Sequence, residues 1–459
     1  AARSGKALRF SAVMLNPSTQ IDDRADDAMS GSALSSRQVF AEFLRRALFR
    51  NRVQLLGGVI FAIGLPLIAR FGFTDLPVGR DVVYNTMIGS FFAISLGFLF
   101  FRRLIDYPGT EGIAYSVPVF AVTFSAVLIV FLFLRLEYSR YLFGASYLLS
   151  VMWFTAISIA MVRLRTLKIG IVPGGASDRL LSLRAIQWCE IKQPDAMPAK
   201  VDAIVADLRH SFPLEWESFI AEAAVSGTPV YDVKHLRETL TGRLEIEHLS
   251  ENTLGSLNPN DMFLKVKQAI DWLLALIVMA VLLPVLALIA LAIRIESPGA
   301  AIFRQPRMGY RGQVFTLYKF RTMRSEEASS GDERNRAITK AEDSRITRLG
   351  HFLRKTRIDE LPQIINILRG EMSWIGPRPE AVPLSEWYEK ELPFYRYRHI
   401  VRPGISGWAQ VMQGHVATPD EVLEKLHYDF YYIKNFSPWL DLLIVLKTIR
   451  TMLTGFGAR

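Results

Sequence analysis

The sequence predicts a membrane protein of the α plus α/β class, with three folded domains in a row. Half of its 459 residues are hydrophobic, and many of these lie in long runs that charged residues flank. Short strand-like segments alternate with helical patterns in the middle of the chain. These patterns exclude a disordered or collagen-like chain and argue against a purely soluble protein.

Residues 1–50 are polar and basic, and they predict a cytoplasmic tail that runs into a short helix. No cleavable signal peptide is expected, because the first long apolar run begins near residue 53 and lacks a cleavage site. Four apolar runs follow, each close to the roughly 20 residues that a spanning helix needs. They lie at about 53–70, 83–101, 113–134 and 142–162.

These runs predict a four-helix transmembrane bundle over residues 51–165. Arginines precede the first run, Arg102 and Arg103 lie between the second and third, and Arg163 follows the fourth. By the positive-inside rule, this pattern places both ends of the bundle in the cytoplasm. A soluble all-helical core is the alternative, but four consecutive runs with charges confined between them disfavour it.

Residues 166–255 predict a small Rossmann-like α/β domain, because strand-like segments alternate with helical patterns. The strand-like segments lie at 168–173, 201–207 and 228–233. Gly174 and Gly175 follow the first of them, but GIVPGGAS does not match the GxGxxG pattern of dinucleotide-binding turns. A regulatory or scaffolding role is therefore favoured over cofactor binding for this domain.

The last domain, residues 262–459, begins with an apolar run that Pro284 interrupts. Lysines precede this run and arginines follow it, so both of its ends belong on the same side of the membrane. Because a proline bends a helix, we predict a re-entrant membrane helix at 270–293. A fifth span with a proline kink is the alternative.

Residues 438–453 are amphipathic, which predicts a helix on the membrane surface or packed on the domain's own core.

The densest chemical signal is the segment LRKTRIDELPQIINILRG at 353–370. Its apolar residues recur at helical spacing and Asp359 stands where an N-cap would, so one interpretation is a capped amphipathic helix. The other interpretation is functional, because Arg354 precedes the adjacent carboxylates of Asp359 and Glu360. Arginines at a helix N-terminus bind phosphate and keep a carboxylate ionised, as a nucleophile or a magnesium ligand requires. This segment alone leaves both interpretations open.

Cations in other motifs favour the functional interpretation. KFRTM contributes Lys319 and Arg321, GPRPE contributes Arg378, and RPGISGWAQ contributes Arg402. Rigidly placed cations beside a carboxylate pair suit phosphoryl transfer, and a net charge of +10 suits an anionic substrate or membrane.

No Ser/His/Asp triad, His/Cys metal spacing or nucleic-acid-binding motif stands out, so we expect no nucleic acid partner. The single cysteine, Cys189, excludes an intramolecular disulfide.

Four segments taken in order resemble the bacterial sugar transferases, also called monotopic phosphoglycosyl transferases or polyprenyl-phosphate hexose-1-phosphate transferases. These segments are SPGAAIFRQPRMGYRGQVFTLYKFRTM, LRKTRIDELPQIINILRGEMSWIGPRPE, RPGISGWAQV and YDFYYIKNFSPWLDLLIVLKT. The resemblance covers about residues 262–459. The preceding bundle and α/β domain fit the large members of the family, which begin exopolysaccharide, capsule or O-antigen synthesis.

The resemblance implies transfer of hexose-1-phosphate from a UDP-hexose, glucose or galactose, to undecaprenyl phosphate with release of UMP. It implies that Asp359 is the nucleophile and forms a covalent phosphosugar-aspartate, and that Glu360 helps to bind Mg²⁺. The remaining family positions imply binding of the substrate or its phosphates. They fall on Lys319, Arg321, Arg354, Arg378 and Asp429.

The resemblance also implies a multi-pass protein of the bacterial inner membrane, with a cytoplasmic catalytic domain and a bilayer partner. A bundle of this size could support a homodimer.

One segment departs from the family, because residues 411–415 read VMQGH where an Asn-Gly-Arg-like turn is common. We therefore assign no binding role to His415. A glycosyltransferase that releases UDP and a non-catalytic membrane scaffold are the alternatives, and the intact Asp-Glu motif disfavours both.

Overall fold

The computed structural model describes residues 50–72, 80–108, 110, 112–164, 168–181, 183, 186–194, 201–246, 261–324, 345–413 and 419–454. The chain divides into two compact units, Ala1–Gly242 and Arg243–Arg459. The predicted basic tail, up to residue 49, and His415 lie outside the described residues.

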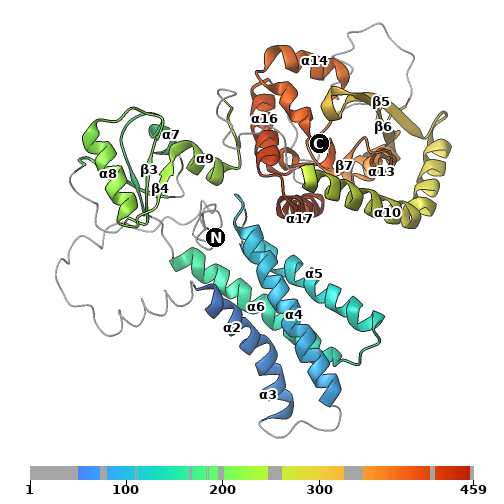
Figure 1. Ribbon diagram of the computed structural model, residues 1–459. Coiled ribbons are helices and arrows are strands. Elements are labelled where there is room, and N and C mark those ends of the chain that lie inside the picture. Colours follow the sequence, from blue (N-terminus) through green and yellow to red (C-terminus); the bar gives the residue numbers. More distant parts are fainter. Residues whose placement is uncertain are drawn as a thin grey trace. The chain divides into compact units, whose positions relative to one another are not determined.

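Four helical spans of the first unit are long and apolar enough to cross a membrane. The first span is continuous and consists of α2 (Asn51–Val59), the π-helical η1 (Ile60–Gly64) and α3 (Leu65–Phe71). The others are α4 (Arg80–Ile105), α5 (Gly112–Phe133) and α6 (Arg140–Leu164). All four agree with the predicted apolar runs, and the helices lie side by side (Figure 1).

Aromatic rings fill the space between these helices. Phe120 of α5 stacks on Phe154 of α6 with ring centroids 4.8 Å apart, and both side chains are fully buried. Gly97 of α4 lies against Phe120, so that the absence of a side chain lets α4 and α5 approach closely. Large apolar side chains such as Phe133 and Leu148 remain exposed on the outer faces, as expected of helices that contact lipid.

A four-stranded parallel sheet forms the α/β part of the first unit. Its order is β2 (Gln187–Glu190), β1 (Lys168–Ile171), β3 (Ala203–Ala206) and β4 (Val230–Asp232). The three predicted strands are present, but the prediction missed β2. This edge strand is largely exposed and reads QWCE, so it lacks the apolar run that marks a buried strand.

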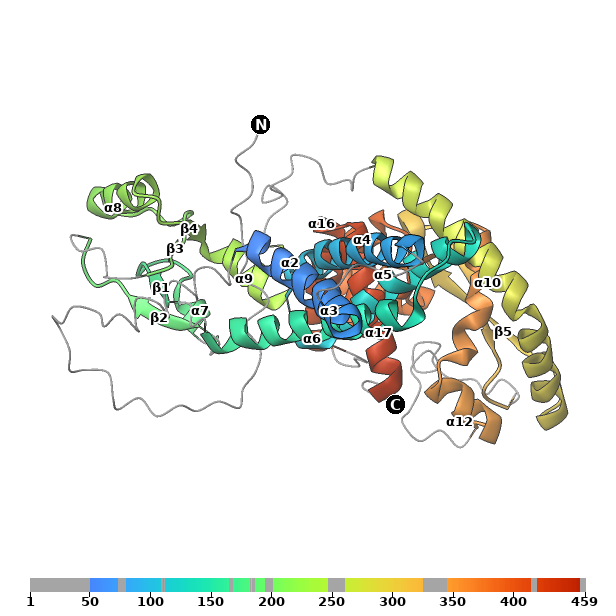
Figure 2. The ribbon, with the colours of Figure 1, turned by 90° about the horizontal axis from the view of Figure 1, so that it is seen from below.

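Helices cover both faces of this sheet. On one face, α7 (Asp178–Leu181) and α9 (Val233–Thr241) pack through Leu180 and Leu236 on Ile169 and Val205. On the other, α8 (Leu214–Val225) packs on Ile204 and Ala206. Figures 1 and 2 show α7 and α8 on opposite sides of the strands. Alternate residues of β3 thus supply two separate cores, as the pleat of a strand requires.

The glycine turn after β1 is occupied by a carboxylate. A Cβ on Gly175 would overlap the Asp207 side chain, and Asp207 Oδ2 accepts a 2.9 Å hydrogen bond from the Ala176 amide. A phosphate bound at this turn would need that amide as a donor. The Asp207 carboxylate therefore already uses one backbone donor of this turn.

The second unit is mainly helical and starts with the 36-residue helix α10 (Asp261–Glu296), which contains Pro284. The ribbon of α10 changes direction along its length (Figure 1). The other helices among the described residues of this unit are η3 (Tyr310–Gly312), α12 (Arg348–Lys355), η4 (Ile358–Gln363), α13 (Ile364–Leu368), α14 (Val382–Glu391), η5 (Tyr395–Ile400), α15 (Trp408–Met412), α16 (Pro419–Lys434) and α17 (Pro438–Thr454). The described strands form two pairs, antiparallel β5 (Ile302–Met308) with β6 (Val314–Phe320) and parallel β7 (Ser373–Ile375) with β8 (Gly404–Ser406).

One face of α10 belongs to the core of this unit. Ala275 packs with Leu317 and Ile367, and Ile293 packs with Phe320 and Leu353. Most other apolar side chains of α10, including Leu273, are exposed. α17 is divided in the same way, because Leu443 and Ile444 are fully buried whereas Ile449 and Met452 are exposed. This burial confirms that α17 packs on the domain's own core, while a position on the membrane surface stays a prediction.

Buried charges fix the first half of α10 to the rest of the unit. Lys267 Nζ lies 2.8 Å from Asp441 of α17 and 3.4 Å from Asp271, one turn further along α10. Ser373 of β7 donates a hydrogen bond to Asp271, and the indole of Trp374 donates to the Asp271 carbonyl at 3.1 Å. Because each buried charge has an opposite partner, α10 is held at a defined position against β7 and α17.

Gly404 allows β7 and β8 to approach each other, and we predict that Gly404→Ala destabilises the protein. A Cβ at this position would overlap the Gly376 amide nitrogen and crowd the Ser406 carbonyl, and backbone atoms cannot rotate away. We expect a loss of about 1–3 kcal/mol, measured as a lower thermal unfolding midpoint in detergent. The control is Gly144→Ala, where a Cβ would meet nothing within 4 Å. Equal midpoints for the two variants would contradict this account.

Candidate active site

The two adjacent carboxylates lie on a short 3₁₀ helix. Asp359 and Glu360 are the second and third residues of η4, so Asp359 is not the N-cap that the sequence pattern predicted. Arg357, at the preceding turn, has a left-handed backbone with φ 59°, which redirects the chain after α12. Pro362 lacks an amide donor, and the regular α-helix begins only at Ile364 and lasts five residues. The carboxylates therefore lie within a short 3₁₀ segment that leads into a five-residue α-helix.

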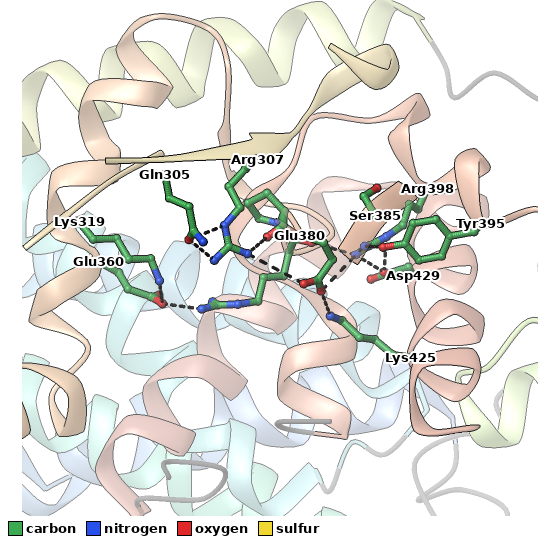
Figure 3. A network of polar contacts seen from close by, with 12 residues as sticks. Gln305, Arg307, Lys319, Glu360, Glu380, Ser385, Tyr395, Arg398, Lys425 and Asp429 are labelled. Atoms are coloured by element: carbon green, nitrogen blue, oxygen red, sulfur yellow. Dashed lines mark hydrogen bonds and ion pairs between the residues drawn. The ribbon is translucent and has the colours of Figure 1, made fainter. Parts of the chain in front are cut away.

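Three cations surround the Glu360 carboxylate. Its Oε1 lies 2.9 Å from Arg378 NH2, 3.2 Å from Lys319 Nζ and 3.5 Å from Arg357 NH1. Lys319 comes from β6 and Arg378 from the loop after β7, so segments distant in sequence meet at Glu360. Figure 3 shows Lys319 and Glu360 at one end of a longer row of polar side chains.

Burial and these cations have opposite effects on Glu360. Burial alone would raise the pKa of its carboxyl, but Arg378, Lys319 and Arg357 together hold that pKa far below the ordinary value. Glu360 in turn raises the pKa of Arg378, whereas burial lowers the pKa of Lys319. The site thus contains a glutamate whose ionised form is favoured by three neighbouring cations.

Asp359 differs from its neighbour in its hydrogen bonding. It is 9% exposed, and its Oδ1 is buried without a hydrogen-bond partner among the described residues. Burial raises the pKa of Asp359, and the adjacent Glu360 raises it further, while Lys319, Arg357 and Arg378 act in the other direction. A carboxylate oxygen without hydrogen bonds beside several cations is free to bond to an incoming phosphorus atom or metal ion.

Two predicted phosphate-binding arginines make other contacts. The Arg321 guanidinium donates to the Ser297 and Pro298 carbonyls, both at 2.7 Å, and so closes the C-terminal end of α10. Arg354 donates from Nε to the Thr322 hydroxyl at 2.9 Å. Of the predicted residues, the structure therefore brings Asp359, Glu360, Lys319 and Arg378 into one cluster and uses Arg321 to fix the end of α10.

A second buried network begins two residues after Arg378. Glu380 pairs with Lys425 of α16, and the guanidinium groups of Arg307 and Arg398 each lie 4.0 Å from its carboxylate. Asp429 of α16, also predicted as a substrate-binding residue, is 1% exposed and lies 2.8 Å from Arg398 NH2. Figure 3 shows Glu380 between Arg307 and Lys425, and Arg398 between Glu380 and Asp429.

Sequence reasoning missed Glu380, Arg398 and Lys425 as parts of this network. The only local signal was the position of Glu380 in GPRPE, on the same rigid turn as Arg378. Arg398 and Lys425 carry no motif, because their roles depend on segments that pack together only in the fold. Burial raises the pKa of Asp429, while the neighbouring Arg398 and Lys425 act against that rise.

Two carboxylates are available to a divalent cation at this site. Among the described residues no group of three His, Cys, Asp or Glu side chains could hold a metal ion. Magnesium is usually bound by one or two protein carboxylates together with substrate phosphates and water. The unpartnered Oδ1 of Asp359 and the adjacent Glu360 fit that pattern, with substrate phosphates as the missing ligands.

Comparison with known proteins gives matches in and beyond this domain. The family model for bacterial sugar transferases matches residues 262–455, which include the whole cluster described above. A UDP-N-acetylgalactosamine-undecaprenyl-phosphate N-acetylgalactosaminephosphotransferase from Aeromonas hydrophila is 40% identical over 427 residues, covering 93% of this chain and 100% of that relative.

Two other relatives match shorter parts of the chain. A UDP-glucose:undecaprenyl-phosphate glucose-1-phosphate transferase from Escherichia coli (strain K12) is 42% identical over 187 residues, covering 40% of this chain and 39% of the relative. A protein of the same name from Caulobacter vibrioides is 42% identical over 194 residues, covering 42% of this chain and 71% of the relative. The similarity to the Aeromonas protein thus extends much further along the chain.

We predict that Asp429→Asn destabilises the second unit, because it leaves the buried Arg398 without its closest counter-charge. Removing one partner of a buried ion pair costs about 3 kcal/mol or more. The thermal unfolding midpoint in detergent should therefore fall by several degrees. The control is Glu386→Gln on the exposed side of α14, which should leave the midpoint unchanged. An unchanged midpoint for Asp429→Asn would contradict a structural ion pair at this position.

His399 should make the protein acid-sensitive. Burial, with Arg398 and Arg396 nearby, lowers the pKa of this imidazole from 6.5 to about 3. Because the unfolded state binds a proton first, the free energy of unfolding falls as the pH drops below about 6.5, by about 2 kcal/mol at pH 5. Thermal unfolding at pH 7.5 and pH 5 measures this loss. His399→Gln should lose less stability over that range, and the exposed-site control His351→Gln should lose as much as the unchanged protein.

Proposed function

Because this chain belongs to the bacterial sugar transferase family, we propose that it transfers a sugar-1-phosphate from a UDP-sugar to undecaprenyl phosphate and releases UMP. One observation carries the proposal. Asp359 is buried, its Oδ1 has no hydrogen-bond partner within the described part of the chain, and it lies directly beside a glutamate that three cations neutralise. This is an arrangement suited to phosphoryl transfer, in which positioning and charge neutralisation supply most of the catalysis.

In the first proposed step, the Asp359 carboxylate attacks the phosphorus atom that carries the sugar. The new bond joins the aspartate oxygen to phosphorus, and the bond that breaks joins this phosphorus to the oxygen bridging the two phosphates. The bridging oxygen and its electron pair leave with UMP, and a covalent phosphosugar-aspartate remains. An aspartyl phosphate is an established type of covalent intermediate.

In the second proposed step, a phosphate oxygen of undecaprenyl phosphate attacks the same phosphorus atom. The aspartate–phosphorus bond breaks, and the carboxylate of Asp359 is restored. The product is an undecaprenyl diphosphate that carries the sugar. Both steps accumulate negative charge on phosphate oxygens, and we propose that Arg378, Lys319 and Arg357, which surround Glu360, offset it.

We propose that Mg²⁺ binds at Asp359 and Glu360 together with the diphosphate of the donor. When bound, it would neutralise part of the diphosphate charge. Glu360 already contacts three cations through Oε1, so this residue balances charge in the pocket whether or not the donor is present. Arg354 remains a proposed phosphate contact from the upstream side of η4.

The donor sugar is proposed from the Aeromonas relative. The sequence resemblance suggested glucose or galactose. The relative that matches 93% of this chain is named for N-acetylgalactosamine, whereas the relatives named for glucose match about two fifths of it. We therefore propose UDP-N-acetylgalactosamine as the first donor to test, with UDP-glucose and UDP-galactose as the comparison.

We propose that α10 enters one leaflet of the bacterial inner membrane and returns, with the catalytic domain in the cytoplasm. The bend of α10, its exposed apolar face and basic residues at both ends support this arrangement (Figure 2). It would place the reaction where a cytosolic UDP-sugar meets a membrane-bound acceptor, as the first membrane step of exopolysaccharide, capsule or O-antigen synthesis.

Product analysis tests the proposed function. Purified protein in detergent receives undecaprenyl phosphate, Mg²⁺ and one radiolabelled UDP-sugar at a time. We expect UMP and a lipid-linked sugar diphosphate. Without undecaprenyl phosphate, mass spectrometry of the digested protein should find the sugar phosphate on the peptide that contains Asp359. Asp359→Asn should abolish the adduct and the turnover, whereas Glu386→Gln should retain both.

The other outcomes identify the alternatives. Release of UDP would make the protein a glycosyltransferase and remove the nucleophile role of Asp359. Unchanged polysaccharide assembly in cells that carry only Asp359→Asn would support a non-catalytic membrane scaffold.

A further inference from the structure

We infer that Arg398 is a positioning residue that holds the backbone of Arg378 in place, and that Asp429 acts through Arg398 without contacting a substrate. The inference rests on the proposed function, because it explains how the Arg378 guanidinium of the proposed active site is oriented. Its starting point is a direct contact. Arg398 NH2 donates a 2.9 Å hydrogen bond to the carbonyl oxygen of Arg378, whose own guanidinium reaches Glu360.

Every nitrogen of the Arg398 guanidinium has a partner. Nε and NH2 donate to Asp429 Oδ2 at 3.1 and 2.8 Å, and NH1 donates to the Tyr395 hydroxyl at 2.7 Å. The side chain is 3% exposed. A planar group whose three nitrogens all donate to fixed partners has one orientation, so the position of the Arg378 carbonyl is set relative to Asp429 and Tyr395.

The two residues that follow Arg378 are fixed as well. Arg307 NH1 donates to the Pro379 carbonyl at 2.9 Å, and Gln305 holds the same guanidinium from the other side at 2.7 Å. The Glu380 carboxylate pairs with Lys425, one helical turn before Asp429 on α16. Figure 3 shows these side chains gathered along one path from Glu360 to Asp429.

The preceding part of the same loop is bound to β8. The Gly376 amide donates to the Ser406 carbonyl at 2.9 Å, and the Gly404 amide donates to the Pro377 carbonyl at 3.0 Å. The backbone is therefore held before, at and after Arg378, and its guanidinium is directed to Glu360. α16 supplies two of these constraints through Lys425 and Asp429, although neither residue contacts Glu360.

A double-mutant comparison tests this role with UMP release as the readout. Asp429→Asn should lower kcat/KM about tenfold or more in the otherwise unchanged protein, because small displacements of catalytic groups cost large factors in rate. In the Arg378→Lys variant the cation at this position is already displaced. There, Asp429→Asn should lower kcat/KM less than about threefold. Such non-additivity shows that two residues act as one unit.

The matched control is Asp441→Asn, which removes an equally close buried ion pair, with Lys267, at a site that has no contact with Arg378. Asp441→Asn should lower kcat/KM by the same factor with Arg378 and with Lys at position 378. If Asp429→Asn also lowers kcat/KM by the same factor in both backgrounds, or leaves kcat/KM unchanged, the inference is overturned. Tyr395→Phe removes the hydroxyl that accepts from Arg398 NH1 without unpairing a charge, and it should show the same coupling more weakly if Asp429→Asn does not fold.

A second measurement does not depend on turnover. Hydrogen exchange of a peptide spanning residues 376–381 should be faster in Asp429→Asn than in the unchanged protein, and unaffected by Glu386→Gln, whose side chain is exposed on α14. Equal exchange in both variants would overturn the inference even if the protein releases UMP. Absence of UMP release from the unchanged protein would instead reject the proposed function, and the exchange experiment would still decide the role of Arg398.

Discussion

The buried charge of Glu360 is the constraint on which the catalytic domain depends. A carboxylate removed from water is strongly unfavourable unless cations and hydrogen bonds compensate for its lost hydration. Here Arg378, Lys319 and Arg357 supply that compensation, and each comes from a different segment of the chain. The strands and turns that deliver these three side chains must therefore keep their relative positions.

Each cation has its own structural support. The antiparallel pairing of β5 and β6 fixes Lys319, and the left-handed backbone at Arg357 turns the chain toward the carboxylates. Arg378 lies on a loop that the close approach of β7 and β8 braces from one side and the Glu380–Arg398–Asp429 network braces from the other. A neighbouring carboxylate, Asp359, is left with an oxygen that makes no hydrogen bond among the described residues.

The same core joins the site to the helix that we propose enters the membrane. Leu317 precedes Lys319 by two residues on β6 and packs with Ala275 of α10. Ile364 of α13 belongs to the same hydrophobic cluster. Arg321 closes the end of α10 through the Ser297 and Pro298 carbonyls. The site is therefore built directly on α10, which suits an enzyme whose proposed acceptor phosphate lies at the membrane surface.

Features that depend on neighbouring residues could be predicted from the order of the amino acids. Long apolar runs predicted the membrane-type helices, strand-like runs predicted β1, β3 and β4, and the motif at 353–370 predicted the carboxylate pair. The tertiary structure decided that Asp359 lies inside a 3₁₀ helix, that Arg321 fixes the end of α10, and that Asp429 meets Arg398. Hydrophobic periodicity extends over neighbouring residues, whereas an ion pair such as Lys319–Glu360 joins residues 41 positions apart. Only the packing of the whole domain brings such partners together, because burying each charge requires an opposite one from another segment.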